Sequence, residues 1–144
     1  MPAQSEQRRT ASALTYDQML ETVRYDGAYP TRERAEQAVH AVLAALGSQL
    51  GDDPRTALAA HLPRQAADVL TAQAPTAQPR TGWSFVQDIA ARTGVTPAVA
   101  RWDTGAVLST VAALLPGDLL TRTINELPAG YALLFGRAEL ARAA

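Results

Sequence analysis

The sequence predicts an all-α fold, in which a four-helix unit occurs twice and closes into one compact helical bundle. Apolar residues recur at helical spacing, and no segment alternates apolar and polar residues as a half-buried strand does. In addition, residues 31–70 align without a gap on residues 96–135, as expected of a duplicated unit. Matched pairs include Thr31/Thr96, Leu43/Leu108, Asp53/Asp118, Leu62/Leu127 and Pro63/Pro128.

The first helix of each unit is expected over residues 16–25 and 84–92. A hydroxyl residue, Thr15 or Ser84, stands before each run of apolar residues, and a glutamine follows three positions later. This pattern is typical of a capping box, in which the hydroxyl accepts a hydrogen bond from the third helical amide and the glutamine reaches back to the cap amide.

A long second helix follows in each unit, capped by Thr31 or Thr96 and with Pro97 tolerated in the first turn. Each helix carries one apolar stripe at helical period, and we expect the two stripes to meet at the centre of the fold. Gly105 interrupts the second helix, where it either admits a neighbouring backbone or marks a kink. The stripes are Ala35, Val39, Val42, Leu43, Leu46 and Leu50, and Ala100, Thr104, Val107, Leu108, Val111 and Leu115.

The third and fourth helices of each unit meet at a Leu-Pro pair. Asp53 and Asp118 are expected as N-caps of the third helices, with Pro54 at the first helical position. Proline disfavours helical geometry in the residue before it and suits a helix start. Pro63 and Pro128 therefore end the third helix and begin a short fourth one, with Leu62 and Leu127 as buried structural side chains at the two corners.

These elements give a division of the chain into two repeats. The expected segments are a flexible N-terminal tail over 1–14, a first repeat over 15–70, a linker over 71–82, a second repeat over 83–136 and a C-terminal tail over 137–144. The pattern leaves open whether the repeats share one core or form two lobes.

Composition excludes several classes of activity. The net charge is −1 with a pI near 6.1, so no strong field attracts nucleic acid or anionic lipid. Cysteine and lysine are both absent, which excludes thiolate catalysis, cysteine-ligated metals, Schiff-base lysines and the P-loop lysine. We expect a soluble, cytoplasmic protein without a membrane span or a cofactor.

The ordered set of motifs resembles one known family. "YDQMLETV", "ERAEQAVHAVLAALGSQL", "GDDP" and "HLP", and then "FVQDIAARTGV", "AVLSTVAALLPGD" and "ELPAGYALLF", are similar to the bacterial family catalogued as domain of unknown function 2267. The resemblance covers residues 16–135 in two copies, departing where Trp102 and Asp103 replace Gln37 and Ala38. It implies a small helical bundle and no established activity.

Catalytic and metal-binding residues are not evident. His40 and His61 are the only histidines and lie 21 residues apart, without the i, i+4 partner of a helical metal pair, so we interpret both as structural. Asp52 and Asp53 are adjacent carboxylates that a helix start explains. We therefore expect a chain that is not an enzyme, with no catalytic, metal or cofactor residue.

Residues 89–102 resemble the start of a helix-turn-helix DNA reader. A reading helix needs donors for base edges and cations for phosphates, whereas this one offers Pro97, Ala98, Val99 and a single Arg101, with Asp103 opposing phosphate. Nucleic-acid binding through this stretch is kept as an alternative function that the missing basic patch disfavours.

Partner contacts are expected at Trp102, Trp83 and Arg101. Trp102 has Gln37 as its counterpart, which favours a partly exposed position, and tryptophan is enriched at interface hot spots; burial in the core is the other interpretation. Tyr131 and Phe135 are four residues apart and are expected to anchor the last helix to the core. We interpret the remaining arginines of the first half as part of a solvated mixed-charge face, because Glu33 and Glu36 interleave with them. These arginines are Arg32, Arg34 and Arg55, with Arg8 and Arg9 in the tail.

The sequence thus favours a non-catalytic helical protein that acts through contacts with an unidentified protein partner, a second copy of the chain included. The alternatives are nucleic-acid association through residues 89–102 and binding of a small ligand between the repeats.

Overall fold

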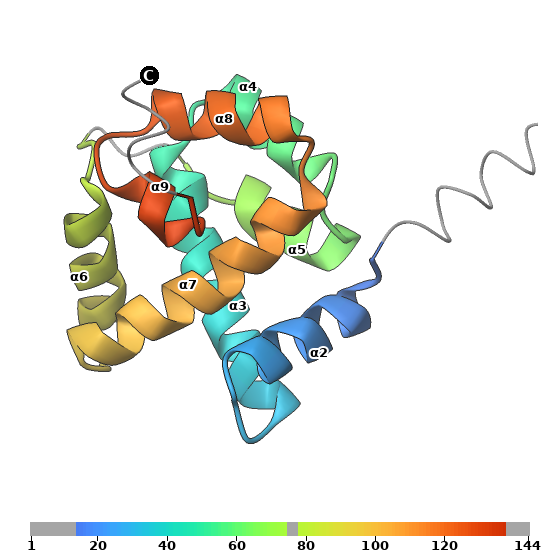
Figure 1. Ribbon diagram of the computed structural model, residues 1–144. Helices are drawn as coiled ribbons and strands as arrows, with labels where there is room; N and C mark the ends of the chain where they lie inside the picture. The colour runs from blue at the N-terminus through green and yellow to red at the C-terminus, as the bar shows by residue number, and fades with distance from the viewer. Residues whose placement is uncertain (1–13, 75–77, 138–144) are drawn as a thin grey trace, which may run out of the picture.

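The computed structural model describes residues 14–74 and 78–137, and all regular structure in these ranges is helical. The all-α prediction is therefore confirmed, and the helices form a compact bundle (Figure 1). In chain order they are α2 (Tyr16–Asp26), α3 (Arg32–Gln49), α4 (Asp52–Ala59), α5 (Arg64–Thr71), α6 (Gly82–Thr93), α7 (Pro97–Leu114), α8 (Gly117–Glu126) and α9 (Tyr131–Leu134).

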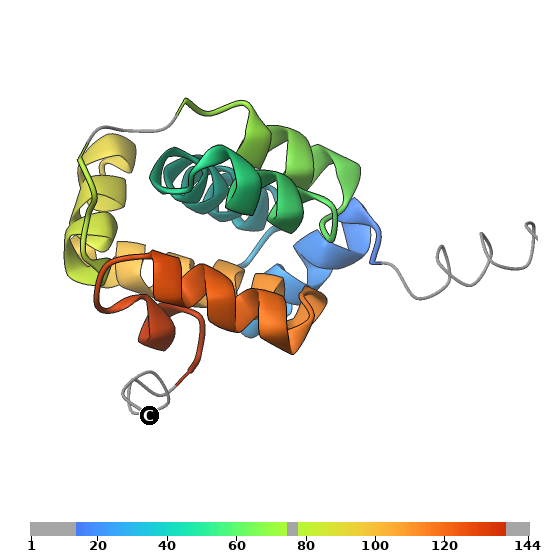
Figure 2. The same ribbon diagram turned by 90° about the horizontal axis from the view of Figure 1, so that it is seen from above.

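The two long helices, α3 and α7, each have 18 residues and cross at the centre of the bundle (Figure 1). All residues of both predicted stripes are buried. Helices α2 and α6 lie at opposite ends of the molecule, and each contacts both long helices (Figure 2). The buried apolar residues of both halves form one continuous cluster, so the halves share a single core.

Three predicted helix starts are confirmed. The Thr15 hydroxyl accepts a hydrogen bond from the Gln18 amide at 3.1 Å, and the Gln18 side chain accepts one from the Thr15 amide at 2.9 Å, which completes the capping box of α2. Thr31 caps α3 and Thr96 caps α7 through the same hydroxyl-to-amide bond. These caps depend on residues three positions apart, so the local sequence suffices to specify them.

The predicted start of α6 is wrong. The helix begins at Gly82 and is capped by Thr81, which accepts from the Ser84 amide at 3.2 Å. A distant contact sets this start, because the Gly82 amide donates to Ala129 O at 2.8 Å. A Cβ on Gly82 would stand 2.7 Å from the carbonyl carbon of Gly130, so only glycine permits the two backbones to approach this closely.

The predicted caps of α4 and α8 are also displaced. Gly51 and Pro116 occupy the cap positions without a side-chain hydrogen bond. Asp53 and Asp118 are instead the second residues of their helices, and Pro54 is the third residue of α4. Both carboxylates lie in the first turn, where they favour the positive end of the helix dipole. Backbone geometry rather than side-chain capping therefore starts these helices.

The two Leu-Pro corners differ. Leu62 and Leu127 are both buried, and α5 begins directly after Pro63. After Pro128, by contrast, Gly130 adopts a left-handed conformation with φ 99°, and α9 begins only at Tyr131. That helix has four residues against eight in α5, so the prediction that Pro128 starts the fourth helix is wrong.

The last helix is nonetheless held by its aromatic residues, as predicted. Tyr131 and Phe135 are buried, and the Tyr131 ring meets Phe85 edge to face with centroids 5.2 Å apart. Each half thus contains a helix, an 18-residue helix and two shorter helices in the same order. That the halves arose by duplication, and the segment bounds assigned from it, stay predictions. The tails lie outside the described residues except for Leu14 and Arg137.

Candidate functional site

Trp102 projects from the second turn of α7 with 58 % of its surface exposed. Its orientation is fixed, since the indole Nε1 donates a hydrogen bond to Gly27 O at 2.8 Å. Gly27 follows α2 in the first half of the chain, so the contact ties the two halves together. The polar atom of the indole is used inside the molecule, and the ring faces remain available for an apolar contact.

The α2–α3 loop is shaped to present this carbonyl. A Cβ on Gly27 would fall 2.2 Å from the Tyr29 ring, so glycine is required for the loop to fold back on itself. Ala28 has φ 55°, a left-handed conformation that is uncommon outside glycine. The Tyr29 amide donates to Arg24 O at 2.9 Å, which fixes the turn below Trp102.

Asp103, beside Trp102, is the centre of a buried polar cluster. Tyr29 donates its hydroxyl to Asp103 Oδ1 at 2.6 Å, and Arg34 Nη2 donates to Oδ2 at 2.8 Å. The Arg34 guanidinium lies 5.1 Å from the Tyr29 ring centroid, within cation–π range. Burial, followed by the hydrogen bond to the Asp103 carboxylate, raises the pKa of the Tyr29 phenol. The cluster joins α7 to the first half through charge-assisted hydrogen bonds.

The expectation that Asp103 opposes phosphate is wrong, since only 5 % of the residue is exposed and its carboxylate is paired with Arg34. One signal in the sequence pointed here, namely the replacement of Ala38 by an aspartate at the equivalent position of the second unit. The identity of its partners depends on where α3 and α7 cross, which no local pattern contains.

The Trp102 groove, as we call it, lies between the α2–α3 loop and the first two turns of α7. It has a volume of about 450 Å³, and its lining includes Gly27, Pro30, Arg34, Val99, Trp102 and Asp103. The two charges in this lining pair with each other, and Val99 is 39 % exposed. An uncharged, apolar surface beside an oriented indole is suited to binding an apolar side chain.

A second groove lies between α3 and α5. It has a volume of about 650 Å³, and its lining includes Gln37, His40, Ala41, Ala44, Asp68 and Val69. Ala41, Ala44 and Val69 are half-buried, whereas His40 and Asp68 are exposed at the margin. We call it the α3–α5 groove.

Both histidines are at the surface. The His40 imidazole lies 3.9 Å from the Glu36 carboxylate with 55 % of its side chain exposed, and His61 lies in the turn after α4 rather than in its last turn. Within residues 14–74 and 78–137, no group of three or more histidine, cysteine, aspartate or glutamate side chains is placed to hold a metal ion.

Arg101 is exposed beside Trp102 and makes no ion pair with the residues that the structure describes. Its guanidinium folds over Gly105, since a Cβ there would lie 2.9 Å from Arg101 Nη1. No backbone atom of another element lies within 4 Å of a Cβ built on Gly105, so of the two interpretations of Gly105, the close approach of a neighbouring backbone is wrong. A free cation therefore adjoins the exposed indole.

Trp83, the other predicted partner contact, is also 58 % exposed. It is the second residue of α6, whereas Trp102 lies near the start of α7. The starts of α6 and α7 lie at opposite ends of α6 (Figure 1). The structure therefore does not bring the two indoles together into one site.

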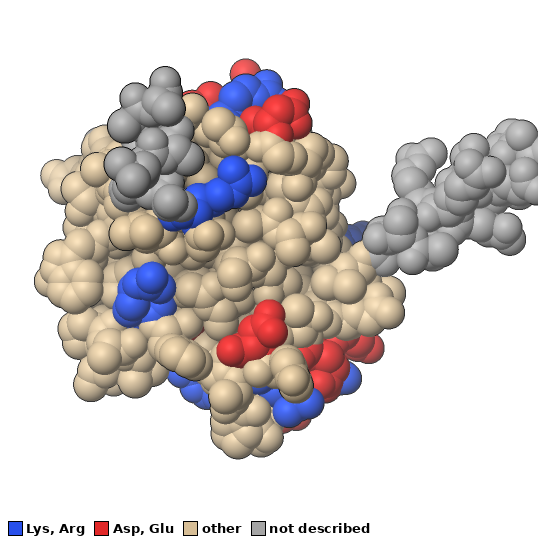
Figure 3. Space-filling view, viewed as in Figure 1, with Lys and Arg blue, Asp and Glu red and all other residues tan. Residues whose placement is uncertain are grey.

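Residues 89–102 span the end of α6, a turn with Gly94 at φ 74°, and the start of α7. Arg92 is engaged by Asp88 at 3.0 Å, which leaves Arg101 as the unpaired cation of this stretch. The face in view in Figure 3, which α7 crosses in Figure 1, is mostly uncharged, with most of its charges along the upper and lower margins. A phosphate-binding surface needs several clustered cations.

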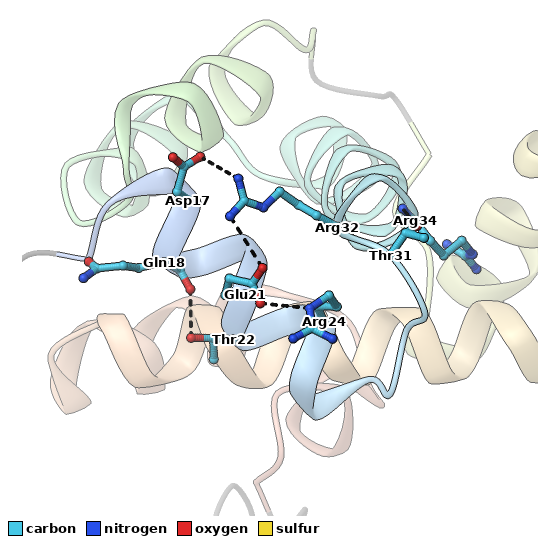
Figure 4. A network of polar contacts seen from close by, with 8 residues as sticks. All are labelled: Asp17, Gln18, Glu21, Thr22, Arg24, Thr31, Arg32 and Arg34. Carbon is cyan, nitrogen blue, oxygen red and sulfur yellow. Dashed lines mark hydrogen bonds and ion pairs between the residues drawn. The ribbon is translucent and has the colours of Figure 1, made fainter.

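An exposed mixed-charge face is present on α2 and α3, but of the described arginines predicted for it only Arg32 takes part, and the prediction for Arg34 is wrong because its guanidinium binds the buried Asp103. Arg32 lies between Asp17 at 3.7 Å and Glu21 at 3.5 Å, and Glu21 also accepts from Arg24 at 2.8 Å (Figure 4). The hydrogen bond from Arg24 is the largest cause that lowers the pKa of the exposed Glu21 carboxyl. These ion pairs are exposed to solvent, and their opposite charges neutralise one another, so the residues do not form a binding site.

Arg55 does not belong to that face, contrary to the prediction. It is 7 % exposed, and its guanidinium donates to Gly47 O at 3.2 Å, to Gln73 O and to the Asp52 carboxylate. The side chain thereby satisfies backbone carbonyls at the ends of α3 and α5. Arg55 is a structural clamp, and Arg8 and Arg9 lie outside the described residues.

The comparisons with known proteins give one match. A family model described as "Uncharacterized conserved protein (DUF2267)" matches residues 16–134, which confirms the resemblance noted in the sequence. The search of curated proteins returned no matching relative. Within the described residues, no helix combines the length and the apolar character that crossing a bilayer requires.

Proposed function

We propose a non-catalytic, protein-binding function for this chain, which belongs to the DUF2267 family of uncharacterized conserved proteins. The contact surface is the Trp102 groove, with the exposed Arg101 at its edge.

One observation carries the proposal: Trp102 is 58 % exposed and yet held in one orientation by its bond to Gly27. An exposed indole gains most from contact with a partner, and a fixed one loses little side-chain entropy when it binds. Covering roughly 100 Å² of exposed ring contributes about 2.5 kcal/mol at 25 cal/mol per Å².

The lining of the groove favours binding over chemistry. The Tyr29 hydroxyl and the Arg34 guanidinium both bond to Asp103, so the ionisable groups in the lining are engaged with one another. A nucleophile beside a general base is the usual requirement for acyl or phosphoryl transfer, and the lining offers neither a serine nor a histidine.

Nucleic-acid association through residues 89–102 gains no support from the surface around it, because Arg92 is paired and Arg101 stands alone. A cytoplasmic location is part of the proposal, since the chain has no cysteine and therefore does not depend on an oxidising compartment.

Affinity capture from the native cell tests the function. Tagged wild-type chain, Trp102→Ala and Trp83→Ala are used as bait, and captured proteins are quantified by mass spectrometry. We expect at least one protein that is captured by wild type and by Trp83→Ala and lost with Trp102→Ala. Because the Trp102→Ala bait can still be bound by Trp102 of the native chain, that chain is left out of the comparison. An identical set of other captured proteins for all three baits, together with no self-association of the purified wild-type chain, would refute the groove as a contact surface.

A further inference from the structure

The α3–α5 groove and the exposed Trp102 match in apolar character. The groove is open and shallow, with half-buried Ala41, Ala44 and Val69 in its lining. Trp102 is a large convex apolar group that belongs to the second half of the chain. An indole in contact with small aliphatic side chains buries apolar area on both sides.

The two surfaces are also complementary in charge. Arg101 lies beside Trp102 and Asp68 lies at the margin of the groove, and neither has an ion-pair partner within the part of the chain that the structure describes. The two halves of the chain also differ in charge, with the acidic excess in the half that holds the groove. Residues 14–74 carry eight acidic and five basic side chains, whereas residues 78–137 carry five basic and four acidic ones.

We propose that the occupant of the α3–α5 groove is Trp102 of a second copy of this chain, with Arg101 of that copy against Asp68. The inference rests on the proposed function, since it uses the same exposed indole and names its partner. Opposite charges beside an apolar contact fix register and accelerate association.

This contact is head-to-tail, because different surfaces of the two copies meet. Each copy keeps one unused groove or one unused tryptophan after a single contact, so the contact either closes into a ring or continues as a chain. A symmetric dimer with Trp102 facing Trp102 would leave no tryptophan unused and would not extend into a ring or a chain. Experiments can therefore distinguish the two arrangements.

Sedimentation velocity of the full chain from about 1 to about 100 µM gives the first test. We expect wild type to self-associate with increasing concentration, and Trp102→Ala to raise the dissociation constant about 30-fold, as for the loss of an interface hot spot. Trp83→Ala is the matched control, because its indole is equally exposed, and it should stay within about twofold of wild type. Equal effects of the two variants would overturn the proposal.

A mixing experiment tests the head-to-tail geometry. Ala44→Arg fills the groove and leaves Trp102 intact, whereas Trp102→Ala leaves the groove intact. Each variant alone is expected to be monomeric, and an equimolar mixture is expected to form a one-to-one dimer and nothing larger. A mixture that stays monomeric would overturn the proposal.

A charge exchange covers the case in which Ala44→Arg fails to fold. Asp68→Arg and Arg101→Asp change exposed side chains, and each alone should weaken self-association several-fold. The double variant, in which both charges are reversed, should recover it. No recovery would refute the Asp68–Arg101 contact. A wild-type chain that is monomeric at about 100 µM overturns this inference and leaves the proposed function standing if Trp102-dependent capture is observed.

Discussion

Replacing Asp103 by alanine removes the acceptor that joins α7 to the first half of the chain. In the folded protein this carboxylate accepts from the Tyr29 hydroxyl at 2.6 Å and from Arg34 Nη2 at 2.8 Å. The substitution leaves both donors without their partner. Because these bonds join α7 to the α2–α3 loop and to the first turn of α3, the loss affects global stability rather than a surface contact.

The magnitude follows from the burial of the three side chains. Removing one member of a buried ion pair costs about 3–5 kcal/mol, but the Arg34 side chain is 28 % exposed, so water replaces part of that interaction. The Tyr29 hydroxyl adds about 1 kcal/mol as a buried donor left unsatisfied. We expect Asp103→Ala to lower the free energy of unfolding by about 3 kcal/mol, which for a chain of this size lowers Tm by about 10 °C.

Urea and thermal denaturation followed by far-ultraviolet circular dichroism measure this effect. Asp118→Ala is the matched control, because it removes an exposed aspartate from the first turn of α8 and should cost less than about 1 kcal/mol. In a double-mutant cycle, Tyr29→Phe should destabilise the Asp103→Ala variant much less than it destabilises the wild type. If Asp103→Ala is no more destabilising than Asp118→Ala, the buried cluster does not hold the halves together and the reasoning fails.

Three further variants test the packing. Arg55→Ala should lower the free energy of unfolding by about 2–4 kcal/mol, since two backbone carbonyls lose their donor. The control Arg64→Ala changes an exposed side chain and should cost less than about 0.5 kcal/mol. Equal losses for the two variants would contradict the role of Arg55 as a clamp. Gly82→Ala should lower the free energy of unfolding by about 1–3 kcal/mol, because its Cβ meets the Gly130 backbone. Gly117→Ala is the control and should be neutral or stabilising, because no atom lies within 4 Å of its Cβ. If denaturation shows Gly117→Ala to be the more destabilising of the two, the close contact at Gly82 is refuted. Tyr131→Phe should be neutral or stabilising by up to about 1 kcal/mol at pH 7, since the buried hydroxyl has no hydrogen-bond partner among the described residues. Burial raises the pKa of the Tyr131 phenol, so the unfolded chain releases this proton first and wild type should lose stability as the pH rises above about 10; a variant with an equally steep alkaline loss would show that Tyr131 does not contribute.

Much of the fold follows from patterns within single helices. All the features that depend on residues close together in the sequence are present as predicted. They are the stripes of α3 and α7, the capping box of Thr15 and the caps at Thr31 and Thr96. The helix starts that were displaced are those set by distant backbone contacts or by backbone geometry. Gly82 against Gly130 is the clearest case, because the close approach joins segments 48 residues apart.

The candidate site was predicted only in part. Two interpretations of Trp102 were left open, a partly exposed position suggested by its glutamine counterpart and burial in the core, and the residue is 58 % exposed. The bond from its indole to Gly27 and the burial of Asp103 were missed, because both depend on the crossing of two helices whose sequences do not encode their relative position. Arg55 was placed on a solvated face because its acceptors, in α3 and in the residues after α5, are brought to it by the packing of α5 against α3, which no local pattern contains.

The sequence by itself determined the helical class, most of the helices and the residues that line the core, because hydrophobic periodicity and capping are local properties of the chain. Tertiary structure alone decided that both halves share one core, that Asp103 and Arg55 are buried with partners, and that Trp102 stands oriented beside a groove. Burial of a charge is favourable only where donors and acceptors converge from separate segments. For Asp103 that convergence is set by the packing of α7 against the first half of the chain, and for Arg55 by the packing of α5 against α3.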